Sequence, residues 1–276
     1  VDPTVHCWVS GSELRRMLRT DFLVNTDARS VLVSAPWTLL MSAGSEQESA
    51  SKTEAVMDEG SVRRSFADRD ERRIQEALQR LSVRRRTEPP ARILPLGRLR
   101  TLSITDEAIF AADGSRVVGW YRCTTSSREV TEWCQPLLEQ ERLSHAALAV
   151  RDAEGRVLLG LRPTSGPGWT NFEFGPTAQW DTCAPTDTSQ RLMSATISTL
   201  ARVRQSDEGG RFNGSVVIYD ILEVGGSDAA LDEDIEWMTL GEVEALARRG
   251  RALTNELRSC VSLLLAALGP VTERAL

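Results

Sequence analysis

Hydrophobic residues recur at helical spacing in several parts of the chain, and this spacing predicts where its helices lie. The clearest run contains Ile74 and Leu81, which share one apolar face of a helix predicted over residues 68–85. Ser65 and Asp68 have the spacing of a capping box at the start of this helix. The same pattern predicts further helices at residues 13–18, 127–138, 188–203, 241–249 and 255–268.

Other stretches alternate between apolar and polar residues and are bounded by turn residues, which is typical of β-hairpins. Residues 108–111 and 117–122 flank an Asp-Gly turn, and residues 145–150 and 156–161 flank a second turn. Additional strands are predicted at 171–174 and 215–224. Strands in hairpins with helices between them indicate an α+β fold with a mixed or antiparallel sheet.

The beginning of the chain repeats the order of residue types found near its end. Residues 8–36 and 237–265 each run through tryptophan, glycine, glutamate, a basic turn, asparagine, arginine and serine. We therefore predict that residues 1–41 are the tail of a truncated first module. Residues 42–60 are small, polar and acidic, as in a flexible linker. The predicted organisation continues with a linker at 42–66, a connecting amphipathic helix at 67–90, a complete module at 91–270 and a tail at 271–276.

The composition narrows the classes of function. A net charge of −6 and a pI near 5.2 argue against nucleic acid as a partner. No apolar run is long enough to span a membrane, so we expect no membrane partner. Five scattered cysteines without a C-x-x-C motif suit buried thiols in a reducing cytoplasm. Lys52 is the only lysine, which disfavours Schiff-base and Walker-type chemistry. With two histidines and no G-x-G-x-x-G motif, we expect no metal and no cofactor.

A first polar cluster follows a turn rich in glycine and proline at residues 166–168. Alternation along the strand predicted at 171–174 puts Glu173 on one face, so Glu173, Thr177 and Gln179 can converge on a ligand. A partly exposed edge strand explains the same residues equally well.

Two further clusters carry side chains suited to catalysis or binding. Asp207 and Glu208 can supply a general base beside Gln205, and the glycines that follow let main-chain amides approach a ligand. A solvated hairpin turn is the alternative for this cluster. Gln135, within a cluster at residues 133–140, can bind a sugar or a base, although polar residues at a helix end more often have no such role.

In their order along the chain, these clusters resemble the nucleotide-sugar (NDP-hexose) 2,3-dehydratase family of deoxysugar biosynthesis. The matching segments lie at residues 25–32, 128–140, 167–168, 174–179, 205–212 and 237–241. The resemblance implies a hydro-lyase that removes the C2 hydroxyl of a dTDP-4-keto-6-deoxyhexose without a cofactor, yielding a 3,4-diketo-2,6-dideoxy sugar. It also implies a homodimer of Nudix-like modules, each with a mixed sheet and flanking helices, that lack the Nudix metal chemistry.

The resemblance also suggests roles for individual residues. Asp207 and Glu208 are the first candidates for the base that takes the C3 proton, and Glu173 is the next. Trp169 or Trp180 can stack on thymine, unless the indole is buried in the core. Guanidinium groups pair well with phosphate oxygens, and the candidates to contact the diphosphate are Arg29, Arg211 and Arg258. The remaining candidates for substrate binding are Gln135, Thr177, Gln179, Gln205, Asn25 and Asn255.

Departures from the family pattern keep other functions open. Most of the first module is absent, the family's run of arginines and asparagines after Phe212 is replaced, and the segment after Gln179 differs. The chain is therefore a truncated and divergent dehydratase, or a non-catalytic module that binds a nucleotide sugar or a partner. A third alternative is a pocket reused in natural-product tailoring.

Overall fold

The computed structural model describes residues 6–41, 56–88, 94–126, 129–139, 143–165, 172–206, 211–225, 231 and 234–268. Its main body is built on a seven-stranded sheet in the order β12–β6–β5–β11–β9, in which β7 pairs with β6 and β8 with β5. β5 and β11 run parallel and the other neighbours run antiparallel, so the predicted mixed sheet of an α+β fold is confirmed. The strands are β5 (Ser144–Ala153), β6 (Arg156–Thr164), β7 (Glu173–Gly175), β8 (Ala178–Asp181), β9 (Thr196–Ser206), β11 (Val216–Val224) and β12 (Glu236–Thr239).

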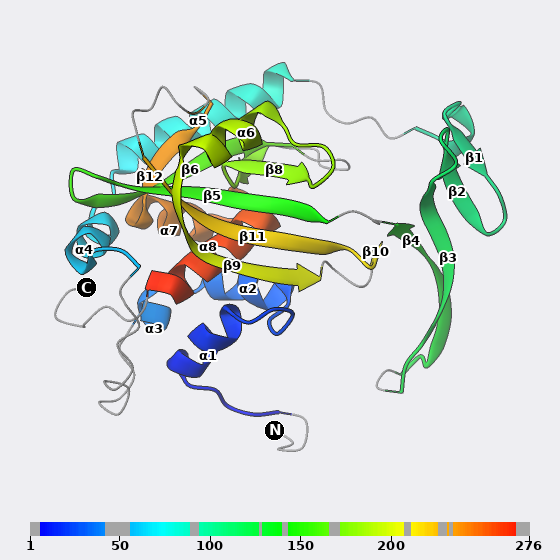
Figure 1. Ribbon diagram of the computed structural model, residues 1–276, viewed down its shortest axis with the longest axis horizontal. Helices are drawn as coiled ribbons and strands as arrows, with labels where there is room; N and C mark the ends of the chain where they lie inside the picture. Colours follow the sequence, from blue (N-terminus) through cyan, green and yellow to red (C-terminus); the bar gives the residue numbers. More distant parts are fainter. Residues whose placement is uncertain are drawn as a thin grey trace.

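Helices cover both faces of this sheet (Figure 1). α7 (Leu240–Arg248) and α8 (Asn255–Leu268) lie on one face, where α8 buries its apolar side chains against β5 and β11. The thiol of Cys260 on α8 contacts the main-chain oxygen of Ala146 on β5 at 3.5 Å. α6 (Asp187–Ala195) belongs to a separate apolar cluster on the opposite face. Among the helices of the described residues, none is long and apolar enough to cross a membrane.

Three N-terminal helices pack against this helical layer. They are α1 (Gly11–Leu18), α2 (Thr26–Ser34) and α3 (Thr38–Met41). All three contact α8, and α2 also contacts α7. Trp37 and Met41 are fully buried and belong to the same core as the residues of β5 and α8, which ties the N-terminal helices to the main body.

The internal repeat in the sequence is matched by repeated local structure. α1 begins with the capping box Ser10–Glu13 and α7 begins with the capping box Thr239–Glu242. α2 is capped by the side chain of Asn25, and α8 by the hydroxyl of Thr254. The pair α1–α2 therefore uses the same capping devices as the pair α7–α8. That residues 1–41 are the tail of a truncated first module stays a prediction.

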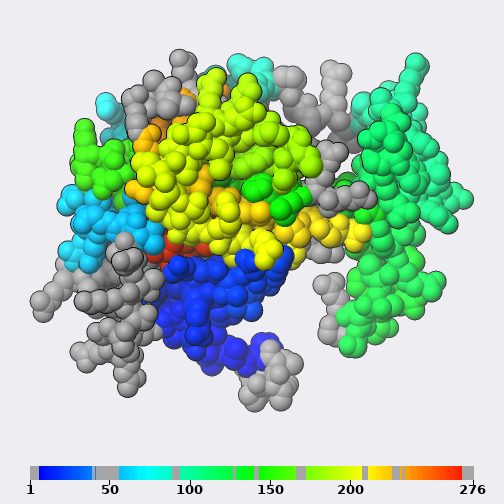
Figure 2. Space-filling model, in the orientation of Figure 1, coloured from blue at the N-terminus to red at the C-terminus, as the bar shows by residue number. Residues whose placement is uncertain are grey.

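A second, five-stranded sheet projects from the main body (Figures 1 and 2). Its strands, in spatial order, are β1 (Leu102–Ile104), β2 (Ala108–Ala111), β3 (Arg116–Thr124), β4 (Glu132–Glu139) and β10 (Phe212–Asn213). Ile104, Ile109, Val118 and Leu138 stand in register across four strands and form an apolar row on one face. Ile104 is 49% exposed and Leu138 is 43% exposed, so this face is less covered than the main sheet.

Most elements with a strong local pattern are confirmed. Both predicted hairpins are present as β2–β3 and β5–β6, and the amphipathic helix is present as α5 (Glu71–Thr87), which buries Ile74 and Leu81. Its start differs from the prediction. The side chain of Asp70 accepts a hydrogen bond from the N–H of Arg72 at 2.8 Å, so Asp70 caps the helix and the capping box expected from Ser65 is wrong.

Residues 59–67 form helix α4 (Glu59–Ala67), which corrects the end of the linker predicted at 42–66. Val62 is 2% exposed and Ser65 is fully buried. The hydroxyl of Ser65 donates to the main-chain oxygen of Val157 and accepts from the N–H of Leu240. The helix is therefore held by residues far along the chain, which its own sequence does not reveal. Residues 42–55 lie outside the described residues.

Two segments predicted as helices contain strands. β4 replaces most of the helix predicted at 127–138, and β9 replaces the second half of the helix predicted at 188–203. Pro136 explains the first error, because proline lacks the N–H that an interior helical turn requires. In β9, buried Ala201 and Val203 alternate with exposed residues, a period of two that is typical of a strand.

The cysteines also differ from the prediction of buried thiols. Cys260 is buried, whereas Cys123 is partly exposed and Cys7, Cys134 and Cys183 are exposed. The prediction is therefore correct for Cys260 and wrong for the others. Cys123 and Cys134 lie on the projecting sheet, which is less covered than the main sheet in the described part of the chain, and Cys183 follows β8.

Candidate functional site

Three of the predicted site residues lie outside the described residues: Asp207, Glu208 and Trp169. Their roles stay predictions. The strand before the first two, β9, ends at Ser206, which pairs with Val216 at the start of β11. The described part of the structure therefore places the end of β9 beside the beginning of β11.

Glu173 and Gln179 lie on opposite faces of the main body. Gln179 stands in register with Ala146, whose side chain belongs to the core beneath α8. Glu173 precedes Phe174, which is fully buried in that same core, so alternation directs Glu173 to the other face. The predicted convergence of Glu173 with Gln179 on one ligand is wrong.

Thr177 has a structural role instead of the predicted contact with substrate. Its side chain is fully buried between β5 and β6. The hydroxyl accepts a hydrogen bond from the N–H of Ala149 at 2.8 Å and donates to the main-chain oxygen of Gly160. The Thr177 hydroxyl therefore bridges the paired residues Ala149 of β5 and Gly160 of β6 inside the sheet.

Gln205, Gln135 and Arg211 lie in three different settings. Gln205 is 2% exposed, and its amide nitrogen has no hydrogen-bond partner within the described residues. Gln135 lies on the projecting sheet, where its side-chain oxygen accepts a hydrogen bond from the indole N–H of Trp133 at 2.9 Å. Arg211 is exposed just before β10. Because a buried amide without a partner is rare in proteins, Gln205 remains the most informative of the three.

Arg29 is fully buried, which corrects the prediction that it contacts a diphosphate. Its guanidinium donates to the main-chain oxygen of Leu18 at 2.7 Å, to that of Val24 at 3.1 Å and to the hydroxyl of Ser262 at 3.0 Å. Burial lowers the pKa of Arg29 from its ordinary value to about 10. Arg29 therefore ties the α1–α2 connection to α8. Asn25, which caps α2, is likewise structural.

Arg258 occupies the matching position in the second copy of the repeat. It is the fourth residue after the capping residue Thr254, as Arg29 is the fourth after Asn25. The Nε atom of Arg258 is buried and has no hydrogen-bond partner in the part of the chain that the structure describes. Asn255 is exposed in the first turn of α8. Both side chains remain available to a ligand.

One cluster that the sequence did not reveal has the geometry of a proton-transfer site. The ring of His145 stacks on Trp180, with centroids 4.7 Å apart and planes 4° from parallel. Its Nδ1 lies 3.5 Å from Oδ2 of Asp220, and Nε of Arg202 donates to Oδ1 of the same carboxylate at 2.5 Å. The side chain of Asp220 is 3% exposed and that of His145 is 16% exposed. The imidazole therefore has a carboxylate on its buried side and an open edge on the other.

The members of this cluster come from different strands, which explains why local sequence patterns miss them. His145 on β5 pairs with Trp180 on β8 and with Ile218 on β11. Asp220 follows on the same face of β11, because side chains two residues apart in a strand share a face. The one available signal was the scarcity of histidine: His145 is one of only two in the chain and lies within an apolar strand.

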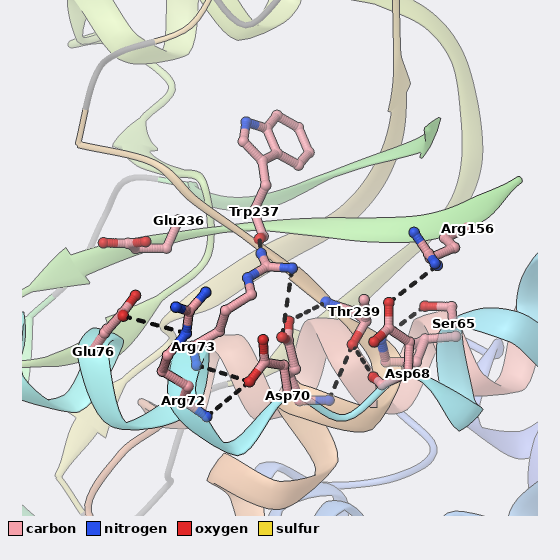
Figure 3. Close-up of polar contacts among 12 residues, drawn as sticks. Ser65, Asp68, Asp70, Arg72, Arg73, Glu76, Arg156, Glu236, Trp237 and Thr239 are labelled. Atoms are coloured by element: carbon pink, nitrogen blue, oxygen red, sulfur yellow. Dashed lines mark hydrogen bonds and ion pairs between the residues drawn. The ribbon is translucent and has the colours of Figure 1, made fainter. Parts of the chain in front are cut away.

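A second polar region surrounds a cavity of about 480 Å³ at the start of α7. Of the side chains that line it, Figure 3 labels Asp68, Arg73, Arg156 and Thr239. The cavity is lined by Asp68, Arg73, Arg151, Ala153, Glu154, Arg156, Leu158 and Thr239.

The arginines of this cavity are bound to other parts of the protein. Arg73 donates to the main-chain oxygen of Trp237 at 2.6 Å, and Arg156 lies 3.0 Å from the carboxylate of Asp68 (Figure 3). The guanidinium of Arg151 lies 4.0 Å from the ring centroid of Trp237. These contacts join α5 and β12 to the hairpin, so we assign the cavity a structural role. Among the described residues, no three His, Cys, Asp or Glu side chains are grouped as a metal site requires.

Comparison with known proteins assigns the family. The model of the NDP-hexose 2,3-dehydratase family matches residues 73–264, which is more than half of the chain. The chain belongs to this family. The resemblance found in the sequence motifs is thereby confirmed, and it covers α5, the projecting sheet and the main body as far as α8.

Two curated relatives show the extent of the similarity, and both are named dTDP-4-dehydro-6-deoxy-alpha-D-glucopyranose 2,3-dehydratase. The one from Saccharopolyspora spinosa is 31% identical over 94% of this chain and 55% of its own length. The one from Streptomyces violaceoruber is 28% identical over 93% of this chain and 56% of its own length. The chain thus spans about half the length of the curated relatives it matches.

Among solved structures, the chain has a distant similarity to an ADP compounds hydrolase. The sequence identity is 14% and the TM-score is 0.35, over 60% of this chain and 92% of that one. At this level of similarity the comparison carries no argument about the fold or the activity of this member of the dehydratase family.

Proposed function

We propose that the chain catalyses the 2,3-dehydration of a dTDP-4-keto-6-deoxyhexose, giving a 3,4-diketo-2,6-dideoxy sugar. The observation that carries this proposal is the family match over residues 73–264. It is supported by the relatives named as dTDP-4-dehydro-6-deoxyglucopyranose 2,3-dehydratases, which align with more than nine-tenths of the chain. Because the chain spans about half of those relatives, their activity and substrate are proposals here.

The reaction requires four proton transfers, two for the elimination and two for the rearrangement that follows, and no redox step. The C4 ketone of the substrate acidifies the hydrogen on C3, so a base can remove it and leave an enolate. Hydrogen-bond donors near the C4 oxygen stabilise the charge that develops there. The C2 hydroxyl then leaves as water once an acid has supplied a proton. The resulting enol rearranges to the 3-ketone when C2 accepts a proton and the C3 hydroxyl loses one.

The candidate residues that remain for this reaction are a subset of those that the sequence suggested. Asp207, Glu208 and Glu173 are the proposed bases. For substrate binding we propose Gln205 and Arg258, each with a buried nitrogen that has no partner among the described residues, together with the exposed Arg211 and Asn255 and with Trp169, which lies outside the described residues. Gln179 is left out because it faces away from Glu173. Gln135 is a weaker candidate because its amide oxygen already accepts the indole N–H of Trp133.

The remaining parts of the proposal rest on the family resemblance. We propose that the main body is a Nudix-like module without the metal chemistry of that fold. We also propose that the protein is a homodimer, that it acts in the cytoplasm, and that the deoxysugar belongs to antibiotic biosynthesis.

Direct assay tests the proposal. The purified protein is incubated with dTDP-4-keto-6-deoxyglucose and a 3-ketoreductase that traps the unstable diketone, and the products are analysed by mass spectrometry. We expect a trapped product lighter than the substrate by one oxygen atom, because dehydration removes water and the reductase then adds two hydrogens. Folded protein that binds dTDP but forms no such product would contradict the dehydratase assignment.

One observation favours a second candidate, a module that binds the nucleotide sugar without converting it. The chain spans about half the length of the curated relatives, so the turnover for which they are named need not extend to this chain. Calorimetry with dTDP separates the two functions. Binding together with turnover supports the dehydratase, and binding without turnover supports the second candidate.

A further inference from the structure

His145, Asp220 and Trp180 form the one histidine–carboxylate group that we find in the described part of the main body, and none of them belongs to the residues proposed above as bases. They lie where β5 and β11 begin and β8 ends, because Ser144 pairs with Asp181 and also with Val217. A ligand at this rim of the sheet can reach the open edge of the imidazole without entering the core.

The elimination needs an acid at the leaving oxygen as well as a base at C3, because hydroxide is a poor leaving group. Histidine is the side chain whose ordinary pKa lies nearest neutral pH, so it can hold a proton and release it during turnover. We infer that His145 is the general acid that protonates the departing C2 hydroxyl and that Asp220 positions its ring. This inference rests on the proposed function.

Two side chains flank the imidazole of His145 and fix the orientation of its ring. The carboxylate of Asp220 lies 3.5 Å from Nδ1, and the parallel indole of Trp180 presents its electron-rich face to the ring. Arg202 holds Oδ1 of Asp220, which leaves Oδ2 directed at Nδ1. Nδ1 is buried, so the exposed edge of the ring carries the other nitrogen. Distances of this kind commonly shorten once a substrate is bound.

The proton balance closes with His145 in this role. Nε2 of the imidazolium gives its proton to the C2 oxygen, the C2–O bond breaks and water leaves. The electron pair of the C3–H bond, released when the carboxylate base takes that proton, becomes the C2–C3 double bond of an enol. The base then returns its proton to C2, and the C3 hydroxyl gives its proton back to His145. Both groups are restored and one water is released.

The test compares two substrates that differ in the leaving group. Wild type and His145→Asn are assayed with dTDP-4-keto-6-deoxyglucose and with its 2-deoxy-2-fluoro analogue, because fluoride leaves without an acid. We expect H145N to dehydrate the natural substrate roughly 10²–10⁴-fold more slowly, the range of general acid catalysis. It should eliminate fluoride, and exchange the C3 hydrogen with D₂O, at rates within a factor of about three of wild type.

Two matched variants accompany this test. His6→Asn changes the other histidine of the chain and should leave both reactions unchanged. Asp220→Asn keeps the size of the positioning residue but removes its charge, and it should slow dehydration while sparing fluoride elimination. Circular dichroism and thermal unfolding of each variant show whether it is folded before its kinetics are compared.

Three results would overturn the inference. H145N that dehydrates the natural substrate nearly as fast as wild type shows that His145 is not the acid. H145N that loses dehydration, fluoride elimination and C3–H exchange equally shows a structural or binding role. Wild-type protein that is folded yet neither exchanges C3–H nor eliminates either group rejects the proposed dehydratase function itself, and the role of His145 with it.

Discussion

Arg29 offers a sharp test of the structure, because the sequence motif assigns it to a ligand and the structure assigns it to the core. The perturbation is Arg29→Met, which keeps a long side chain but removes the charge and every donor. Three acceptors lose their partner in this variant: the main-chain oxygens of Leu18 and Val24 and the hydroxyl of Ser262.

The expected loss follows from two opposing contributions. A hydrogen bond from a charged donor contributes about 1.5–3 kcal/mol, so the three bonds together stabilise the fold by roughly 5–9 kcal/mol. Burial opposes them: lowering the pKa of Arg29 from its ordinary value to about 10 corresponds to a cost of about 3 kcal/mol for the charged form. We therefore expect R29M to lower the free energy of unfolding by about 3 kcal/mol, since the methionine restores part of the apolar packing.

Arg258→Met is the matched control, because it changes the equivalent arginine in the second copy of the repeat. Its buried Nε has no partner among the described residues, so removing it leaves no acceptor unsatisfied. We expect R258M to change stability by less than about 0.5 kcal/mol and to weaken the binding of dTDP. Urea unfolding at equilibrium measures the first quantity for both variants, and calorimetry measures the second.

The lowered pKa of Arg29 also sets the sign of a pH effect. Below about pH 10 the guanidinium is protonated in both the folded and the unfolded chain. Above about pH 10 the folded chain releases a proton that the unfolded chain still keeps, so this group makes the free energy of unfolding rise with pH there. R29M should lack this contribution. The reasoning is refuted if R29M is as stable as wild type, or if it loses affinity for dTDP while R258M does not.

Three further predictions concern the C-terminal helices. Thr239→Ala removes the N-cap of α7 and should cost about 1–2 kcal/mol in urea unfolding, whereas Ser10→Ala, at the exposed cap of α1, should cost about half as much. Burial raises the pKa of Glu242 above its ordinary 4.5, so the unfolded chain ionises at a lower pH than the folded chain. The free energy of unfolding should therefore fall as the pH rises from about 4.5. Glu242→Gln should abolish this fall, which urea unfolding at several pH values would measure. Burial also raises the pKa of the Cys260 thiol, so a thiol reagent should label it only after unfolding, whereas mass spectrometry should find rapid native-state labelling of Cys7, Cys134 and Cys183.

The elements that the sequence predicted correctly are those whose pattern is complete within one segment. The hairpin β5–β6 has alternating apolar strands around a tight turn, and α5 has an apolar face and a following pair of prolines. The errors arose where distant residues decide the structure. α4 is held by contacts with Val157 and Leu240, and β9 is a strand because it pairs with β11 along its length.

The candidate site divides in the same way. The motifs were sufficient to identify the family, because an ordered set of short segments does not depend on where each side chain points. They did not show that Thr177 lies inside the sheet, or that Glu173 and Gln179 project to opposite faces, because both depend on strand register. His145 was overlooked for the same reason, since its partners are brought to it by β8 and β11.

The internal repeat places an arginine at the same position in each copy, and the two arginines have different surroundings. Arg29 and Arg258 follow their capping residues by the same interval, and α2 packs against α8. Arg29 finds the hydroxyl of Ser262 four residues after Arg258, whereas the residue four after Arg29 is Val33, which offers no acceptor. One arginine of the pair has therefore become part of the core, while the other keeps an unpartnered donor. Because a buried donor without a partner costs about 1–3 kcal/mol, Arg258 is the position of the pair at which the proposed binding of dTDP is best tested.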